Sequence, residues 1–213
     1  MNRTEVIDII RDNLGFNTGL SETVILRHID RVQTRYETAD GRLPMAWFLL
    51  NTTATVDTVA DQRTIDVPAG FLDLSEKWPL TIKDAEGTDH PLTREDYDLL
   101  QADLGLEGFP THYAFDGKVV HLFPKPDAVY TINFPHYARG SALSTVTTAD
   151  WYTEFPSLII AETFLSIAKS SRDKDGIKIA MEDVTVERDL YRTAVVAKEH
   201  SLQELKLGAE VGD

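Results

Sequence analysis

The stretch 113-YAFDGKVVHLFPKPDAVYTINFPHY-137 decides the fold of this 213-residue chain. Near its start, Asp116-Gly117 separates two β-prone runs, residues 112–115 and 118–123. An Asp-Gly pair between such runs is one of the strongest short signals for a β-hairpin, because both residues accept the positive φ angles of a tight turn. The pair therefore predicts an antiparallel hairpin.

The second half of the stretch predicts a third strand. Pro124 and Pro126 mark a turn, because proline has no N–H group to donate to a β-ladder. Residues 129–134 then alternate, which is typical of a strand with one buried face. The residues on that face are Tyr130, Ile132 and Phe134. We therefore expect a three-stranded antiparallel meander.

Helical patterns flank this β-rich region on both sides. Apolar residues recur at helical spacing in residues 4–14, 21–38, 157–172 and 177–205. Residues 157–172 are apolar around most of the helix, which indicates a central, buried helix. The last helix has a 4-3-4-3 pattern typical of a helix–helix seam. Its members are Ile177, Met181, Val184, Arg188, Tyr191, Val195, Lys198, Leu202 and Leu205.

One further helix is predicted inside the β-rich part, at residues 93–104. Thr93 has the properties of an N-cap, and Asp96 stands three residues later. Leu92 and Tyr97 have the spacing of a hydrophobic staple. Short strands are expected around residues 64–68 and 80–83, where β-branched residues are frequent.

The order of these segments predicts an α+β fold. The N- and C-terminal helices form a bundle, and an antiparallel β-domain is inserted between them. We expect the bundle to comprise residues 1–42 and 144–207, and the β-domain, with its one helix, residues 43–143. Residues 208–213 are expected to be a flexible tail.

Charge is unevenly distributed along the chain. The formal net charge is -14, and residues 43–110 alone contribute 4 basic and 13 acidic residues, or -9. An acidic protein repels nucleic-acid phosphates, so sequence-specific DNA or RNA binding is disfavoured. The simplest interpretation is that acidic loops keep the protein in solution.

Several functional classes find no support in the sequence. The chain has no cysteine, which excludes disulfides, thiolate metal sites and a cysteine nucleophile. It also lacks the phosphate-loop, dinucleotide-binding, nucleophile-elbow and zinc-protease motifs. The N-terminus has no apolar signal region, and the longest apolar run is far shorter than a membrane span. We expect no enzyme activity, no cofactor and no membrane partner.

Three histidines of the β-rich region, His112, His121 and His136, are the only metal-ligand candidates of note. They could converge across neighbouring strands. The alternative is that they are polar residues of a half-exposed sheet. We favour that interpretation and predict no metal site.

Three arginines indicate a candidate interaction surface more clearly than the histidines indicate a metal site. Arg27, Arg31 and Arg35 are each four residues apart, so they lie on one face of the second predicted helix. Such a face is commonly a solvated helix surface. It also suits an acidic partner, and the 43–110 segment of a neighbouring copy is a candidate. A contact of that kind is heterologous and can close into a ring.

In its order of features, nearly the whole chain resembles the head–tail adaptor (connector, head-completion) proteins of tailed bacteriophages. The likeness is carried by 19-GLSETVILRHIDRVQTRYE-37, 64-TIDVPAGFLDLSE-76, the block 109–143 and 151-WYTEFPSLIIAETFLSIA-168. The succession and spacing of these segments carry the resemblance.

The resemblance implies a virion structural protein of the neck, made in the host cytoplasm. It implies a ring, of twelve copies, that binds the portal and links it to tail or nozzle proteins. Double-stranded DNA would pass through the ring without sequence-specific binding, and acidic residues of the 43–110 segment would line the channel. Candidate inter-subunit or portal contacts are Arg27, Arg31, Arg35, Arg188, Tyr191, Arg192, Leu202 and Leu205.

A second interpretation stays open from the residues alone. Aromatic residues on the β-domain could form a stacking surface for a carbohydrate or another small molecule. The residues concerned are Trp78, Tyr113, Tyr130 and Tyr137. Aromatic residues at alternating strand positions more commonly belong to a core.

Overall fold

The chain divides into two compact units. The computed structural model describes residues 1–14, 19–38, 44–75, 77–100 and 105–210, with side chains described to residue 198 and at residue 201. One unit, here the helical unit, comprises Met1–Phe48 and Gly140–Asp213, and the other, the β-unit, comprises Leu49–Arg139. The predicted α+β fold, a helical bundle with an inserted β-domain, is confirmed.

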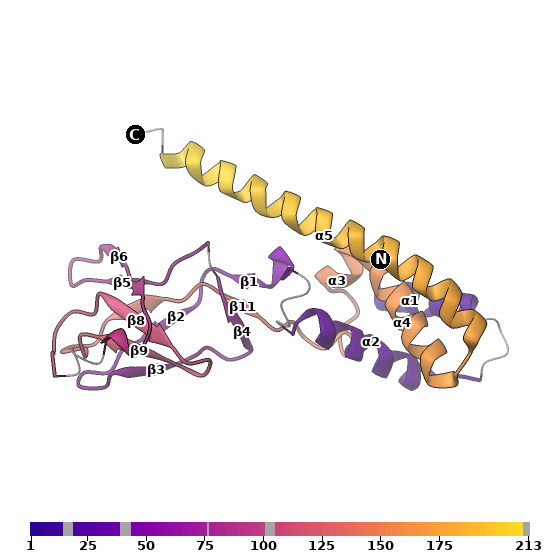
Figure 1. Cartoon of the computed structure of the whole chain (residues 1–213), viewed down its shortest axis with the longest axis horizontal. Coiled ribbons are helices and arrows are strands. Elements are labelled where there is room, and N and C mark those ends of the chain that lie inside the picture. The colour runs from indigo at the N-terminus through magenta and orange to yellow at the C-terminus, as the bar shows by residue number, and fades with distance from the viewer. Residues whose placement is uncertain (15–18, 39–43, 76, 101–104, 211–213) are drawn as a thin grey trace. The chain divides into compact units, whose positions relative to one another are not determined.

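In its described residues, the helical unit has five α-helices (Figure 1). They are α1 (Arg3–Asn13), α2 (Glu22–Tyr36), α3 (Asp150–Glu154), α4 (Pro156–Ser171) and α5 (Lys174–Glu210). Asn2 and Glu5 form a capping box at the start of α1, with two hydrogen bonds of 3.0 Å. Pro156 occupies the first turn of α4, where its missing N–H group costs nothing. Helix α4 packs against α1, α2 and α5, as its apolar sequence predicts.

The seam between α4 and α5 differs from the predicted pattern. Val184 and Tyr191 of the predicted seam are buried as predicted, whereas Met181 is 53% exposed and the unpredicted Gly176 and Ala180 are buried. The physical reason is close helix packing. Gly176 and Ala180, four residues apart, are small enough for the backbones of α4 and α5 to approach each other, and Met181 lies on another side of α5. Val195 is buried as predicted, and the predicted seam residues Leu202 and Leu205 lie outside the described side chains.

An aromatic cluster joins α2, α3 and α5 in the helical unit. Tyr191 of α5 stacks on Trp151 of α3 at 6.1 Å, and its ring also contacts Tyr36 of α2 at 5.3 Å. Its hydroxyl donates to the carbonyl oxygen of Pro44 at 2.7 Å. Tyr191 is fully buried, so its side chain belongs to the core of the helical unit.

Eleven short strands lie in the part of the β-unit that the structure describes. They are β1 (Leu50–Asn51), β2 (Thr55–Asp57), β3 (Thr64–Asp66), β4 (Phe71–Leu74), β5 (Thr81–Lys83), β6 (Asp89–Pro91), β7 (Thr93–Arg94), β8 (His112–Phe115), β9 (Val119–Phe123), β10 (Thr131–Asn133) and β11 (His136–Ala138). They form sheets of order β1-β11-β4, β2-β10-β5-β6 and β3-β9-β8-β7. The pairs are antiparallel except β7–β8. Ile82, Val120, Leu122, Ile132 and Phe134 make the centre of the shared core.

The predicted hairpin at Asp116-Gly117 is confirmed, because β8 and β9 pair with Phe115 opposite Val120. Gly117 has φ +93°, which only glycine adopts without strain. The Asp116 carboxylate accepts N–H groups from Val119 and Lys118, each at 3.0 Å. These hydrogen bonds, together with one from His121, lower the pKa of Asp116 to about 2.

The predicted three-stranded meander is wrong. Strand β9 pairs with β3 on its other side, and β10 lies in another sheet between β2 and β5. The reason is the chain between them: the Lys125 N–H bonds to Leu106 O, and Pro126 O accepts from Asp61 N–H. These bonds fasten residues 124–128 to other loops, so the segment crosses between sheets and makes no hairpin turn.

The predicted helix at residues 93–104 is also wrong over its described part. Thr93–Arg94 form β7, a strand parallel to β8. The N–H groups of Thr93 and Glu95 bond to carbonyls of the β8 segment at 3.0 and 2.9 Å, so they are not free to be capped. Leu92 is buried in the β-core. Residues 101–104 lie outside the described residues.

Among the described helices, none combines the length and apolar character that a membrane crossing requires.

Candidate interaction surfaces of the helical unit

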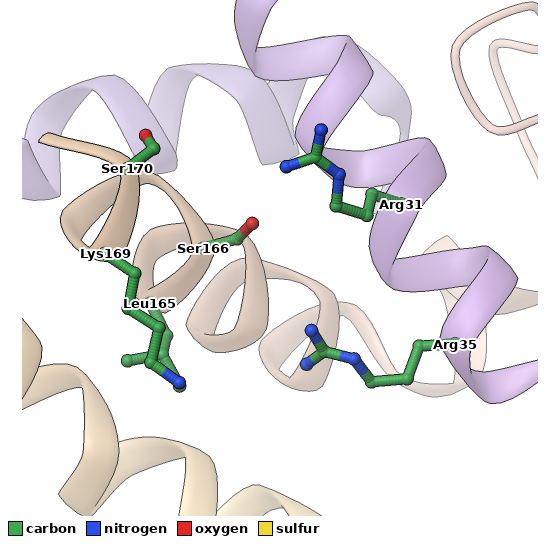
Figure 2. Close-up of a pocket in the computed structure, with 6 residues that line it drawn as sticks. All are labelled: Arg31, Arg35, Leu165, Ser166, Lys169 and Ser170. Carbon is green, nitrogen blue, oxygen red and sulfur yellow. The ribbon is translucent and has the colours of Figure 1, made fainter. Parts of the chain in front are cut away.

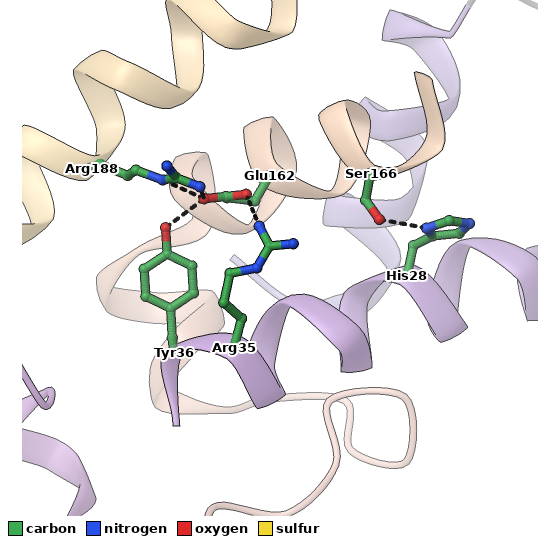
Figure 3. Close-up of polar contacts among 6 residues, drawn as sticks. All are labelled: His28, Arg35, Tyr36, Glu162, Ser166 and Arg188. Atoms are coloured by element: carbon green, nitrogen blue, oxygen red, sulfur yellow. Dashed lines mark hydrogen bonds and ion pairs between the residues drawn. The ribbon is translucent and has the colours of Figure 1, made fainter. Parts of the chain in front are cut away.

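A buried carboxylate stands at the junction of three helices (Figure 3). Glu162 of α4 is 0% exposed. Its Oε2 accepts from Arg35 Nη1 of α2 at 2.8 Å, and its Oε1 accepts from the Tyr36 hydroxyl and from Arg188 Nε of α5, each at 2.7 Å. Burial and hydrogen bonding to Glu162 raise the pKa of Tyr36 well above its usual range. The network fastens α2 and α5 to α4.

Two of the predicted contact residues are thus engaged within the unit, namely Arg35 and Arg188. Their partner Glu162 was not among the residues predicted from the sequence to form contacts. A signal for it exists: Glu162 is the one charged residue in the apolar segment 157–168. A charge in a buried helix requires partners, because an unpaired buried carboxylate is very costly.

A basic pocket lies beside this network, between α2 and α4 (Figure 2). Its volume is about 330 Å³. Its lining residues are Arg31, Arg35, Leu165, Ser166, Lys169 and Ser170. Among the described residues, no carboxylate forms an ion pair with Arg31 or Lys169. Uncompensated cations around a concave surface suit a carboxylate or another anion.

The other predicted contacts are scattered. Arg27 is exposed on the same side of α2 as Arg31. Arg192 is exposed and lies 3.6 Å from Asp189 on its own helix. Tyr191 is buried in the aromatic cluster, which leaves it no surface for a partner. The side chains of Leu202 and Leu205 lie outside the described residues.

His28 of α2 reports on the charge of the basic pocket. Its side chain is buried, and Nδ1 lies 2.8 Å from the Ser166 hydroxyl (Figure 3). Burial lowers the pKa of His28, and the guanidinium groups of Arg31 and Arg27 lower it further.

We expect the substitution Arg31→Glu to raise the pKa of His28, because it replaces a repelling charge with an attracting one. In the native protein the unfolded chain takes up the proton first, so stability is lost as the pH falls below about 6.5. The variant should lose less stability in that range. An NMR titration of the His28 ring, assigned with His28→Asn, measures the shift. Arg192→Glu serves as the control, and an unchanged or lower pKa in Arg31→Glu would contradict this electrostatic account.

The histidines of the β-unit do not converge. His121 lies 3.3 Å from Asp116, His112 lies 2.8 Å from the Thr111 hydroxyl, and His136 is buried. Within the part of the chain that the structure describes, no group of three or more histidine and acidic residues is placed to hold a metal ion.

The aromatic residues of the second interpretation do not form one surface either. Tyr113 is buried on β8, and Tyr137 lies on β11 in a different sheet. Tyr130 packs against the core of the β-unit and donates its hydroxyl to Asp127 at 2.7 Å. Trp78 is half-buried in the segment before β5. Because Tyr113 and Tyr130 belong to the core of the β-unit, the four residues do not support a carbohydrate site.

Comparison with known protein families shows to which family the chain that carries these surfaces belongs. A family model described as SU10 adaptor protein matches residues 1–197. The chain belongs to the SU10 adaptor protein family. The resemblance to phage head–tail adaptors is thereby confirmed, and the chain is a bacteriophage adaptor, a structural protein of the virion. No curated protein matches the chain significantly.

Proposed function

We propose that this adaptor assembles into a ring of identical copies beneath the portal and links the portal to tail proteins. The observation that carries the proposal is the family match, which extends over both units of the chain. The resemblance to phage head–tail adaptors, which implies a ring, also implies that the ring has twelve copies. Neighbouring copies contact one another through the exposed cationic face of α2, and the C-terminal part of α5 contacts the portal.

The charge of the chain fits passage of DNA through such a ring. With a net charge of -14, the protein repels the phosphate backbone on average. We propose that acidic residues of the 43–110 segment line the channel, so that the duplex slides without being held. A basic lining would bind the phosphates and retard the DNA.

Reconstitution with the portal protein of the same phage tests the proposal. We expect the mixture to give a complex with several adaptor copies per portal by light scattering, and a ring with an open centre by electron microscopy. The complex should not bind double-stranded DNA of any sequence at physiological salt. The proposal would be overturned if the adaptor did not bind the portal at micromolar concentration, or if it bound without forming a ring.

A further inference from the structure

A second concave surface of the helical unit has the opposite charge to the basic pocket. It is a groove of about 390 Å³ between α1, α4 and α5. Its lining residues are Met1, Ile9, Asn13, Ser157, Ile160, Ala161, Phe164, Asp183, Val186 and Glu187. Its floor is apolar and only partly covered, since Ile9, Ile160, Phe164 and Val186 all retain exposed surface. Asp183 and Glu187 supply its acidic edge.

The apolar floor continues along α5. Ile179, Val186 and Leu190 are each more than half exposed. Their spacings of seven and four residues place them on one side of the helix. Single exposed apolar residues are ordinary, but three on one side of a helix beside an apolar groove indicate a surface that a partner covers.

The acidic edge indicates the charge of that partner. Asp183 and Glu187 are four residues apart, so they lie on the same side of α5. Among the described residues, neither forms an ion pair. A partner that covers the groove must therefore bring cations to this edge, or two carboxylates are desolvated without compensation.

The helical unit itself carries a surface of that chemistry. Arg31 and Lys169 border the basic pocket without carboxylate partners among the described residues, and Arg27 is exposed on the same side of α2. Arginine and lysine have long aliphatic stems that cover apolar surface while their charged ends reach polar groups at its edge. An apolar floor with an acidic edge is complementary to such side chains.

We propose that the groove of one copy binds the basic face of α2 and α4 of a second copy, with Arg31 and Lys169 opposite Asp183 and Glu187. The two surfaces share no lining residue, so the contact is heterologous and leaves each copy one free surface of each kind. Successive copies can then add until a ring closes. The inference rests on the proposed ring and names the surfaces that build it, both within the helical unit.

Engineered cysteines test the contact cleanly, because the chain has no cysteine of its own. Two single variants, Lys169→Cys and Glu187→Cys, are mixed and assembled on the portal protein under mild oxidation. We expect disulfide-linked dimers in the mixture and none from either variant alone. Asp189→Cys is the matched control, since Asp189 is an exposed acid on another side of α5. The yield of disulfide-linked dimers from Asp189→Cys and Lys169→Cys should be about tenfold lower, because only two cysteines that the contact holds side by side have a high effective concentration.

Charge exchange provides an independent measurement. Lys169→Glu should weaken assembly about tenfold, because it sets a like charge against the acidic edge. Combining it with Glu187→Lys should restore assembly. Rings that form on the portal without the Lys169–Glu187 disulfide, or with Lys169→Cys linking to cysteines in the 43–110 segment, would overturn this contact and leave the proposed function intact. If no ring forms on the portal at all, the result contradicts the proposed function itself, and with it the contact that rests on the ring.

Discussion

The substitution Glu162→Ala is expected to lower the free energy of unfolding of the helical unit by about 3 kcal/mol, and at most about 5 kcal/mol. The carboxylate is 0% exposed and accepts from Arg35, Tyr36 and Arg188 on two neighbouring helices. Its removal leaves a buried tyrosine hydroxyl and two guanidinium groups without their common acceptor. The lower value applies because both arginines are partly exposed and can regain water.

Urea unfolding followed by circular dichroism measures this effect, with Glu182→Ala as the control. Glu182 is an exposed glutamate of α5, so its removal should change stability by less than about 0.5 kcal/mol. A double-mutant cycle adds a second criterion. Once Glu162 is absent, Arg188→Ala should cost much less than it does in the native protein. Equal costs in both backgrounds, or a loss below 1 kcal/mol in Glu162→Ala, would show that the network does not hold the helices.

Most of the described α-helices follow from the sequence, because their signals are local; the short helix α3 was not predicted. Apolar spacing and caps placed four of the helices within a few residues of their observed bounds. The partners of the helices do not follow in the same way. The apolar pattern of residues 157–172 predicts burial, but the pairing of Glu162 with Arg35 and Arg188 joins residues 127 and 26 positions apart. No local pattern specifies such pairs.

The β-unit shows where local signals mislead. The Asp116-Gly117 hairpin is a local contact, and it was predicted correctly. Sheet membership of β10 depends on β2 and β5, whose paired residues lie fifty or more positions earlier, so adjacency in sequence wrongly suggested β9 as its partner. Thr93 has the sequence signals of a helix start, but it forms a parallel β-ladder with β8 instead. Tertiary pairing uses the same N–H groups that a cap would satisfy, and it buries Leu92 as well.

The substitution Phe134→Ala is expected to cost the β-unit about 3–5 kcal/mol. Phe134 is 0% exposed and contacts the rings of Phe71 and His136 at 6.2 and 5.7 Å. Deleting the ring removes buried apolar surface and leaves a cavity that short strands fixed by their ladders cannot refill. Hydrogen exchange followed by mass spectrometry gives the local measurement, since amides of the β-unit should exchange faster by two orders of magnitude or more, about 1.4 kcal/mol for each tenfold.

Val129→Ala provides the matched control for this core substitution. Val129 lies five residues away in the same segment, but it is 66% exposed, so its truncation should change stability by less than about 0.5 kcal/mol. The contrast tests the alternation that the sequence predicted for residues 129–134, in which Ile132 and Phe134 are buried together. Equal effects of the two substitutions would mean that the strand does not present Phe134 to the core. Faster exchange confined to the helical unit would contradict the assignment of Phe134 to the core of the β-unit.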